Sequence, residues 1–212
     1  MRCQEIFWDF DGTLFDTYPR ITRAFMRGLE DAGITTTYET AFARVKVSLG
    51  HAARLYAGEA GISESVLSEG YRRHAEDEGI DGFRLFPDTK ETLERIVEAG
   101  GHHYLYTHRG ETALPALDHA GIIGLFRDAV TGKMGFPLKP APEALQYLMH
   151  RWKLRSEDCL MVGDRVIDVQ AGLNAGMAGV MLDPDGLCPD MPGVYRCRDM
   201  KEFARWIAPE AK

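Results

Sequence analysis

The 212-residue sequence has no run of about 18 consecutive apolar residues, the length that a membrane-spanning helix requires. It also has no basic run, since 32 Asp and Glu outweigh 25 Lys and Arg and the formal net charge is −7. Proteins that bind nucleic acids concentrate positive charge, so this balance argues against a nucleic-acid partner. We expect neither a membrane nor a nucleic acid among its partners. The hydrophobic fraction of 45% is sufficient for a packed core.

Cysteine is scarce and scattered. The four cysteines stand at Cys3, Cys159, Cys188 and Cys197, and no two of them form a Cys-x-x-Cys pair. This spacing is typical neither of a zinc site nor of a disulfide framework. We therefore expect reduced thiols in a cytoplasmic protein.

Short apolar segments alternate with helical patterns along most of the chain. The segments that we predict as strands are Glu5–Trp8, Tyr104–Thr107, Ala129–Thr131, Leu160–Val162 and Gly179–Leu182. Each is followed by a turn signal and then by helical periodicity. After Phe86 a further helix is expected at 88–100, where Asp88 is expected to cap the helix through its side chain. Alternation of this kind predicts an α/β fold with a Rossmann-like parallel sheet covered by helices on both faces.

The region between Thr17 and Gly82 differs from the rest, because about four helical patterns follow one another without a clear strand. Ile21, Phe25 and Leu29, for example, recur at helical spacing. We expect residues 16–83 to form a helical domain inserted after the first strand. Residues 1–15 and 84–212 would then form the Rossmann-like catalytic core.

The strongest chemical signal is a pair of carboxylates directly after the first strand. Alternation along an extended chain directs Asp9 and Asp11 to the same side, at the strand end where α/β sheets bind ligands. Two like charges this close are costly unless a cation lies between them or one is protonated. Gly12 permits a tight turn, and its N–H can approach an anion. Asp11-Gly12 alone also fits an ordinary Asx turn, but that turn would leave Asp9 unexplained.

Other strand ends carry groups that complement these acids. Asp164 ends one predicted strand and Asp168 follows one helical turn later, while Thr107 ends another strand at the approach to a helix. Lys139 stands between two prolines just before a helix. Each has an ordinary explanation, as a helix cap or a solvated lysine. Together, carboxylates suited to Mg²⁺ and cationic or N–H groups suited to phosphate indicate phosphoryl transfer with an aspartate nucleophile.

These motifs resemble those of the haloacid dehalogenase superfamily, and specifically its Mg²⁺-dependent phosphatases. The four motifs of that family correspond to Asp9, Asp11 and Thr13; to Thr107; to Lys139; and to Asp164 with Asp168. Their order and spacing agree over nearly the whole chain, and the helical insertion falls where the family's type 1 cap falls. Phe15–Pro19 and Phe136–Pro142 are most similar to phosphoglycolate phosphatase-like members. Asp88 and Arg165 depart from a common glycine and a frequent serine, and Arg165 adds positive charge near the site.

The resemblance implies a role for each motif residue. Asp9 would be the nucleophile that forms an aspartyl-phosphate, and Asp11 the general acid and then base. The Mg²⁺ ligands would come from Asp9, Asp11 (through its carbonyl) and Asp164, with Asp168 orienting Lys139 or a metal-bound water. Thr107 and Lys139 would complete the catalytic set. The phosphate would be bound by Gly12, His108 and Arg109 together with these residues.

The inserted helices are expected to select the substrate, a small-molecule phosphate ester. Arg44, Lys46 and His51 lie near a helical break at Gly50, and closure of the insertion would bring them toward an anionic leaving group. A phosphomutase of the β-phosphoglucomutase kind would carry the same four motifs. A non-catalytic phosphoryl-accepting or phosphate-binding module is the alternative outside enzymes. We expect a monomer or a homodimer.

Overall fold

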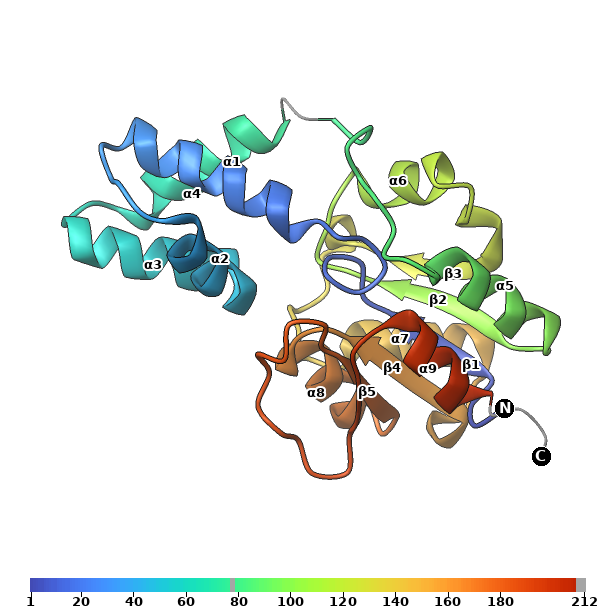
Figure 1. Ribbon diagram of the computed structural model, residues 1–212. Coiled ribbons are helices and arrows are strands. Elements are labelled where there is room, and N and C mark those ends of the chain that lie inside the picture. Colours follow the sequence, from blue (N-terminus) through green and yellow to red (C-terminus); the bar gives the residue numbers. More distant parts are fainter. Residues whose placement is uncertain (77–78, 209–212) are drawn as a thin grey trace. The chain divides into compact units, whose positions relative to one another are not determined.

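The computed structural model describes residues 1–76 and 79–208 of the chain (Figure 1). Contacts divide it into two compact units. The sheet unit comprises Met1–Asp16 and Arg84–Lys212, and the helical unit comprises Thr17–Phe83. Each unit has its own cluster of buried apolar side chains.

The sheet unit is built on six parallel strands in the order β3-β2-β1-β4-β5-β6. Their bounds are Glu5–Trp8 (β1), His102–Tyr106 (β2), Phe126–Val130 (β3), Cys159–Gly163 (β4), Ala178–Leu182 (β5) and Tyr195–Cys197 (β6). The predicted α/β fold with a Rossmann-like parallel sheet and a helical insertion is confirmed. The sixth strand was not predicted from the sequence, because it has three residues and lies at the sheet edge, where no apolar run is needed.

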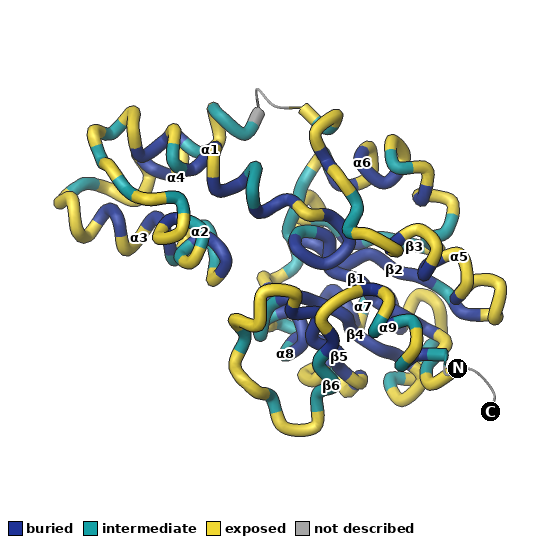
Figure 2. The backbone as a smooth tube through the Cα atoms, in the orientation of Figure 1, coloured by how far each residue is buried: buried dark blue, intermediate teal, exposed yellow. Residues whose placement is uncertain are grey.

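Helices cover the sheet. They are Thr89–Glu98 (α5), Ala113–His119 (α6), Glu143–Trp152 (α7), Val166–Asn174 (α8) and Met200–Ile207 (α9). Neighbouring side chains of β1 point to opposite faces. Phe7 stacks on Tyr104, with ring centroids 4.6 Å apart, in a buried cluster that includes residues of α7 and α8. Trp8 instead meets Phe203 of α9 edge to face at 5.1 Å. Figure 2 shows these central strands as buried and the outer helical surfaces as exposed.

A histidine is buried on the Trp8 side of the sheet. The Trp8 indole N–H donates to Nδ1 of His103 at 2.9 Å, so the other ring nitrogen carries the proton and donates to the Leu93 carbonyl at 3.0 Å. Burial lowers the pKa of His103 to about 4. The folded protein therefore holds this ring neutral.

The described residues of the helical unit, 17–76 and 79–83, contain four helices: Tyr18–Asp31 (α1), Tyr38–Val47 (α2), Leu49–Ala60 (α3) and Glu64–Glu76 (α4). Its core includes Phe25 and Leu29, two of the residues whose spacing predicted α1. α1 and α4 touch backbone to backbone at Gly28 and Gly70. A Cβ atom at Gly28 would lie only 2.8 Å from the backbone nitrogen of Tyr71. Glycine is required here because the helices approach too closely for a side chain.

The predicted side-chain cap at Asp88 is wrong. Asp88 precedes α5 with φ of 63°, in the left-handed region, and its side chain makes no capping hydrogen bond. A capping side chain reaches the first helical N–H groups from an extended backbone, which this turn does not have. The left-handed backbone is the conformation that glycine adopts without steric cost.

The two links to the insertion pair with each other inside the sheet unit. The Asp16 N–H donates to the Arg84 carbonyl at 2.9 Å, and the Phe86 N–H donates to the Leu14 carbonyl at 3.0 Å. The chain therefore leaves and re-enters the sheet unit at neighbouring points, just beyond β1.

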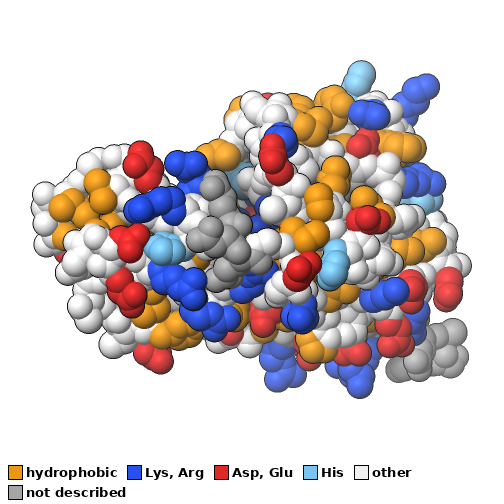
Figure 3. All heavy atoms as spheres, turned by 90° about the horizontal axis from the view of Figure 1, so that it is seen from above, with side chains coloured by type: hydrophobic (Ala, Val, Ile, Leu, Met, Phe, Trp, Pro, Cys, Tyr) orange, Lys and Arg blue, Asp and Glu red, His pale blue; other side chains and the backbone are white. Residues whose placement is uncertain are grey.

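Charges of both signs are interspersed on the molecular face drawn in Figure 3. No helix within residues 1–76 and 79–208 has the length and apolar character of a membrane span.

Candidate active site

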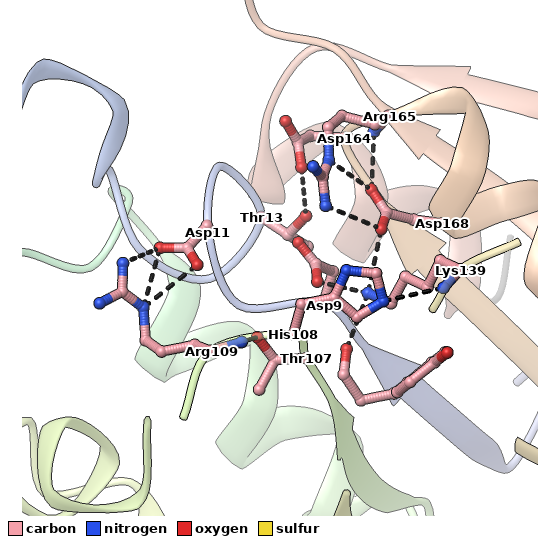
Figure 4. A network of polar contacts seen from close by, with 11 residues as sticks. Asp9, Asp11, Thr13, Thr107, His108, Arg109, Lys139, Asp164, Arg165 and Asp168 are labelled. Atoms are coloured by element: carbon pink, nitrogen blue, oxygen red, sulfur yellow. Dashed lines mark hydrogen bonds and ion pairs between the residues drawn. The ribbon is translucent and has the colours of Figure 1, made fainter. Parts of the chain in front are cut away.

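The carboxyl end of β1 places Asp9 at the centre of the site (Figure 4). The Asp9 N–H donates to the Val162 carbonyl at 3.0 Å, so the backbone continues the pairing of β1 with β4 as far as the carboxylate. Asp9 is only 1% exposed. Since β1 lies between β2 and β4, Thr107 and Asp164 follow the two neighbouring strands at the same edge of the sheet.

Lys139 is held by three oxygens at this edge. Its ammonium lies 2.5 Å from Asp9 Oδ1 and 3.0 Å from Asp168 Oδ1, and it donates to the Tyr106 carbonyl at 2.9 Å. The side chain has no exposed surface. A buried ammonium is tolerated only when charge and hydrogen bonds compensate for lost hydration, and both are present here.

Asp168 connects Lys139 to Arg165. Its Oδ2 accepts the Arg165 N–H at 3.0 Å, which caps α8, and the Arg165 guanidinium lies 3.3 Å from the same oxygen. Burial alone would raise the pKa of Asp168, but Arg165 and Lys139 lower it to about 2. Asp168 is therefore ionised, and both of its oxygens are engaged by cations.

Three buried carboxylates come together beside this lysine. Each of Asp9, Asp164 and Asp168 has an oxygen within 4.8 Å of the others, a grouping that can hold a metal ion. Asp9 Oδ2 is buried and accepts no hydrogen bond from the residues that the structure describes. Burial and the charge of Asp168 raise the pKa of Asp9 to about 7, against the opposing effect of Lys139 and Arg165. A buried carboxylate oxygen beside further carboxylates suits a hard divalent cation.

Asp11 does not join this cluster through its side chain. In Figure 4 its carboxylate points toward Arg109, whose Nε lies 3.1 Å from both carboxylate oxygens and whose Nη2 lies 2.5 Å from Oδ1. Gly12 follows with φ of 78°, and its N–H donates to the Phe15 carbonyl at 2.8 Å. The structure thus pairs two of the predicted site residues, Asp11 and Arg109, and uses the Gly12 N–H to close the loop.

Thr107 and His108 follow β2 and form one side of the site. Thr107 is buried, and its hydroxyl accepts the Arg109 N–H at 3.0 Å. The His108 ring turns toward Lys139, whose backbone N–H donates to His108 Nε2 at 2.8 Å. The predicted phosphate-binding turn therefore also contacts the lysine loop.

The sequence profile of haloacid dehalogenase-like hydrolases matches residues 6–182. The chain belongs to this family. This hydrolase is 32% identical over 187 residues to the phosphoglycolate phosphatase of Vibrio parahaemolyticus, covering 82% of this chain and 80% of that protein. A phosphoglycolate phosphatase of Vibrio cholerae is also 32% identical, over 185 residues, with 81% and 80% covered.

Solved structures agree on the fold. A hydrolase from Streptococcus pneumoniae is 32% identical, with a TM-score of 0.63 over 84% of this chain and 92% of that chain. The crystal structure of a predicted phosphoglycolate phosphatase from Haemophilus somnus reaches a TM-score of 0.81 over 98% and 99% of the two chains. At 21% identity, this second likeness concerns the fold alone.

The predicted substrate-selecting residues of this hydrolase lie in the helical unit and have partners there. The Arg44 guanidinium donates to both oxygens of Glu59, at 2.8 and 2.7 Å, and lies 4.2 Å from the centroid of the Tyr56 ring. Lys46 is buried, with its ammonium 4.4 Å from the centroid of the Tyr18 ring. The His51 N–H donates to the Ser48 hydroxyl at 2.9 Å. Their role toward substrate remains a prediction.

Sequence reasoning missed an ion pair of the site and a buried carboxylate at the same edge of the sheet. The Arg109–Asp11 ion pair joins residues 98 positions apart, so no local pattern indicates it. Asp183 follows β5 at the same sheet edge and is fully buried, where it accepts the N–H groups of Leu187 and Cys188. Its place after an apolar strand was the available signal, the same signal that drew attention to Asp9 and Asp164.

Proposed function

We propose that this hydrolase cleaves a small phosphate monoester through an aspartyl-phosphate on Asp9, with Mg²⁺ as cofactor and phosphoglycolate as the first substrate to test. The observation that carries the proposal is the state of the Asp9 carboxylate. One oxygen is bound by the Lys139 ammonium, and the other is buried beside Asp164 without a hydrogen bond from the described residues. The phosphoglycolate phosphatases of Vibrio suggest the substrate.

The carboxylates fit the proposed metal. Carboxylate oxygens are the ligands that Mg²⁺ prefers, and Asp9 and Asp164 offer them at adjacent strand ends. Asp168 is less suited to binding the ion directly, because Lys139 and Arg165 engage its oxygens. We assign it the orienting role. When bound, Mg²⁺ would supply positive charge against which the phosphate and the nucleophile can approach each other.

The chemistry follows from the side chains. An oxygen of Asp9 forms a bond to phosphorus as the bond to the ester oxygen breaks, and Lys139 stabilises the negative charge that both share. Asp11 donates a proton to the leaving alkoxide. It then accepts a proton from the water that cleaves the aspartyl-phosphate and releases inorganic phosphate. Because the Asp11 carboxylate is bound to Arg109 in this structure, the proton donation requires that ion pair to open.

Residues 16–83 are proposed to form a cap domain, which selects the leaving group through Arg44, Lys46 and His51. The paired links at 14–16 and 84–86 are where such a cap would hinge. A monomeric or homodimeric state and a cytoplasmic location stay predictions.

The test is hydrolysis of a panel of phosphate monoesters, including phosphoglycolate and sugar phosphates, with Mg²⁺ and with EDTA. We expect turnover with Mg²⁺, loss of turnover with EDTA, and a rapid first turnover that leaves phosphate on Asp9. Isomerised sugar phosphate in place of free phosphate would identify a mutase. Absence of turnover across the panel, with unaltered folding, would refute the proposed hydrolysis.

A further inference from the structure

The His108 ring reaches out of its own turn to the backbone of the loop that carries Lys139. Residue 108 follows directly after Thr107 at the end of β2, and Lys139 stands 31 residues later. The Lys139 N–H donates to His108 Nε2 at 2.8 Å, a normal length for a strong hydrogen bond. This bond spans two segments of the site that the sheet does not pair directly.

The His108 ring is in the protonation state that accepts this hydrogen bond. An imidazole nitrogen accepts only when it carries no proton, so Nδ1 holds the proton of the neutral ring. Burial, together with the positive charges of Lys139 and Arg165, lowers the pKa of His108 to about 4. The ring is also packed edge to face against Tyr106, with centroids 6.1 Å apart.

The backbone of His108 is itself fixed. The Gly132 N–H donates to the Arg109 carbonyl at 2.9 Å, and a Cβ atom at Gly132 would collide with the His108 carbonyl. The segment after β3 therefore packs tightly against the turn that carries the ring. The other partner in the hydrogen bond is the backbone of Lys139. The side-chain ammonium of this residue contacts Asp9, Asp168 and the Tyr106 carbonyl together.

We propose that the His108 side chain is a positioning residue for Lys139: it anchors the lysine backbone so that the ammonium stays on Asp9. This proposal rests on the proposed function, in which Lys139 stabilises the charge of phosphoryl transfer. It concerns the imidazole ring, whereas the predicted phosphate contact of this residue was its backbone N–H. Anchors of this kind hold side chains to the geometry that the reaction needs.

The experiment compares two substitutions of the ring. His108→Phe keeps a planar side chain and removes the acceptor, whereas His108→Gln retains an acceptor at a similar reach. We expect kcat to fall roughly 10- to 100-fold in His108→Phe, the usual effect of losing a supporting partner, with a smaller change in KM. His108→Gln should recover most of that loss. The matched control is His119→Phe, the same change at an exposed histidine of α6, which should leave kcat unaltered.

The kinetic results distinguish failure of the positioning role of His108 from failure of the proposed phosphatase function. If wild-type protein hydrolyses phosphate esters and His108→Phe matches its kcat, or if both variants lose kcat equally, the positioning role is refuted. If wild-type protein hydrolyses none, the proposed function fails instead. A measurement independent of activity is ¹⁵N NMR of the wild-type imidazole at neutral pH. A proton on Nδ1 and an accepting Nε2 support the proposal, and a proton on Nε2 overturns it.

Discussion

Lys139 in the sheet unit and Lys46 in the helical unit are both buried, at 5% and 6% exposure, but their surroundings differ. The Lys139 ammonium contacts two carboxylates and a carbonyl, while the Lys46 ammonium lies over the face of Tyr18. Paired buried charges depend strongly on one another, because removal of one leaves the others uncompensated. The sheet unit thus concentrates interdependent charges at its strand ends.

The charged pairs of the helical unit differ from those of the sheet unit in their exposure to solvent. Arg44 with Glu59 and Arg73 with Asp31 are at least partly exposed to solvent. Exposed ion pairs contribute about 0–1 kcal/mol, because water competes for both partners. Such residues can change partners at small cost. The comparison predicts that chemistry fails when the sheet unit is altered, and that substrate preference shifts when the helical unit is altered.

The largest effect is expected at the nucleophile. Asp9→Asn removes the attacking carboxylate while preserving its shape, so turnover should fall by roughly 10⁴-fold or more, as for other nucleophile removals. Steady-state kinetics and trapping of the phosphorylated protein measure this. Asp199→Asn is the control, because Asp199 caps α9 and asparagine caps a helix equally well. Near-normal turnover in Asp9→Asn would exclude Asp9 as nucleophile.

Removal of one cation from each unit allows a direct test of the comparison. Lys139→Met leaves Asp9 without its cation and Asp168 with Arg165 alone, which should cost about 3–5 kcal/mol of unfolding free energy. Activity should also fall by about 10²- to 10³-fold with the loss of charge stabilisation. Arg73→Ala removes the cation of an exposed pair with Asp31 in the helical unit and should cost at most about 1 kcal/mol. Urea unfolding measures the free energy lost in each variant. Equal losses would contradict the expected difference between buried charges in the sheet unit and exposed charges in the helical unit.

Close backbone packing at Gly28 is expected to contribute to the stability of the helical unit. Gly28→Ala forces α1 and α4 apart, because its Cβ atom would lie 2.8 Å from the Tyr71 nitrogen and 2.9 Å from the Gly70 carbonyl carbon. The expected loss is about 2 kcal/mol, typical of overpacking. Gly58→Ala in α3 meets nothing within 4 Å and should stabilise by about 1 kcal/mol through helix propensity. Hydrogen exchange of the helical-unit amides reports both changes, and losses of similar size would argue against close packing at Gly28.

Mild acid is expected to weaken the sheet unit through His103. Its pKa of about 4 in the folded protein lies below the ordinary histidine value of 6.5, so the unfolded chain binds the extra proton. The stability from the neutral ring is present above pH 6.5 and is lost as the pH falls toward 4. Between pH 7 and 5 the loss should be about 2 kcal/mol.

The matched variant for this effect is His103→Gln, which does not titrate. The unfolding free energy of wild-type protein should drop between pH 7 and 5 by about 2 kcal/mol more than that of the variant. Urea titrations at both pH values measure the difference. An identical pH dependence in the two proteins would show that His103 is not the group responsible.

The smallest stability effect is expected at Arg44. Since its pair with Glu59 is partly exposed, Arg44→Ala should change the unfolding free energy by less than about 1 kcal/mol. If the helical unit selects the leaving group, the variant should still change the ranking of kcat/KM among phosphate esters. An unchanged ranking in variants of Arg44, Lys46 and His51 would direct the search to Arg165 in the sheet unit.

Much of this architecture follows from the sequence alone. Strands and helices have local periods, so the alternation of apolar runs with helical patterns indicated the parallel sheet, and the run of helical patterns indicated the insertion. Asp9 and Asp164 were found because each follows an apolar strand, and strand ends gather at one edge of a parallel sheet. These inferences depend only on neighbours in the chain.

Only the tertiary structure decides which atoms meet. No local pattern shows that Arg109 binds Asp11, that the His108 ring accepts from the Lys139 backbone, or that the ammonium of Lys139 contacts Asp9 and Asp168 together. Asp88 failed as a cap because the turn that re-enters the sheet unit imposes a left-handed backbone. Each of these features depends on the packing of segments distant in the sequence, and periodicity carries no information about that packing.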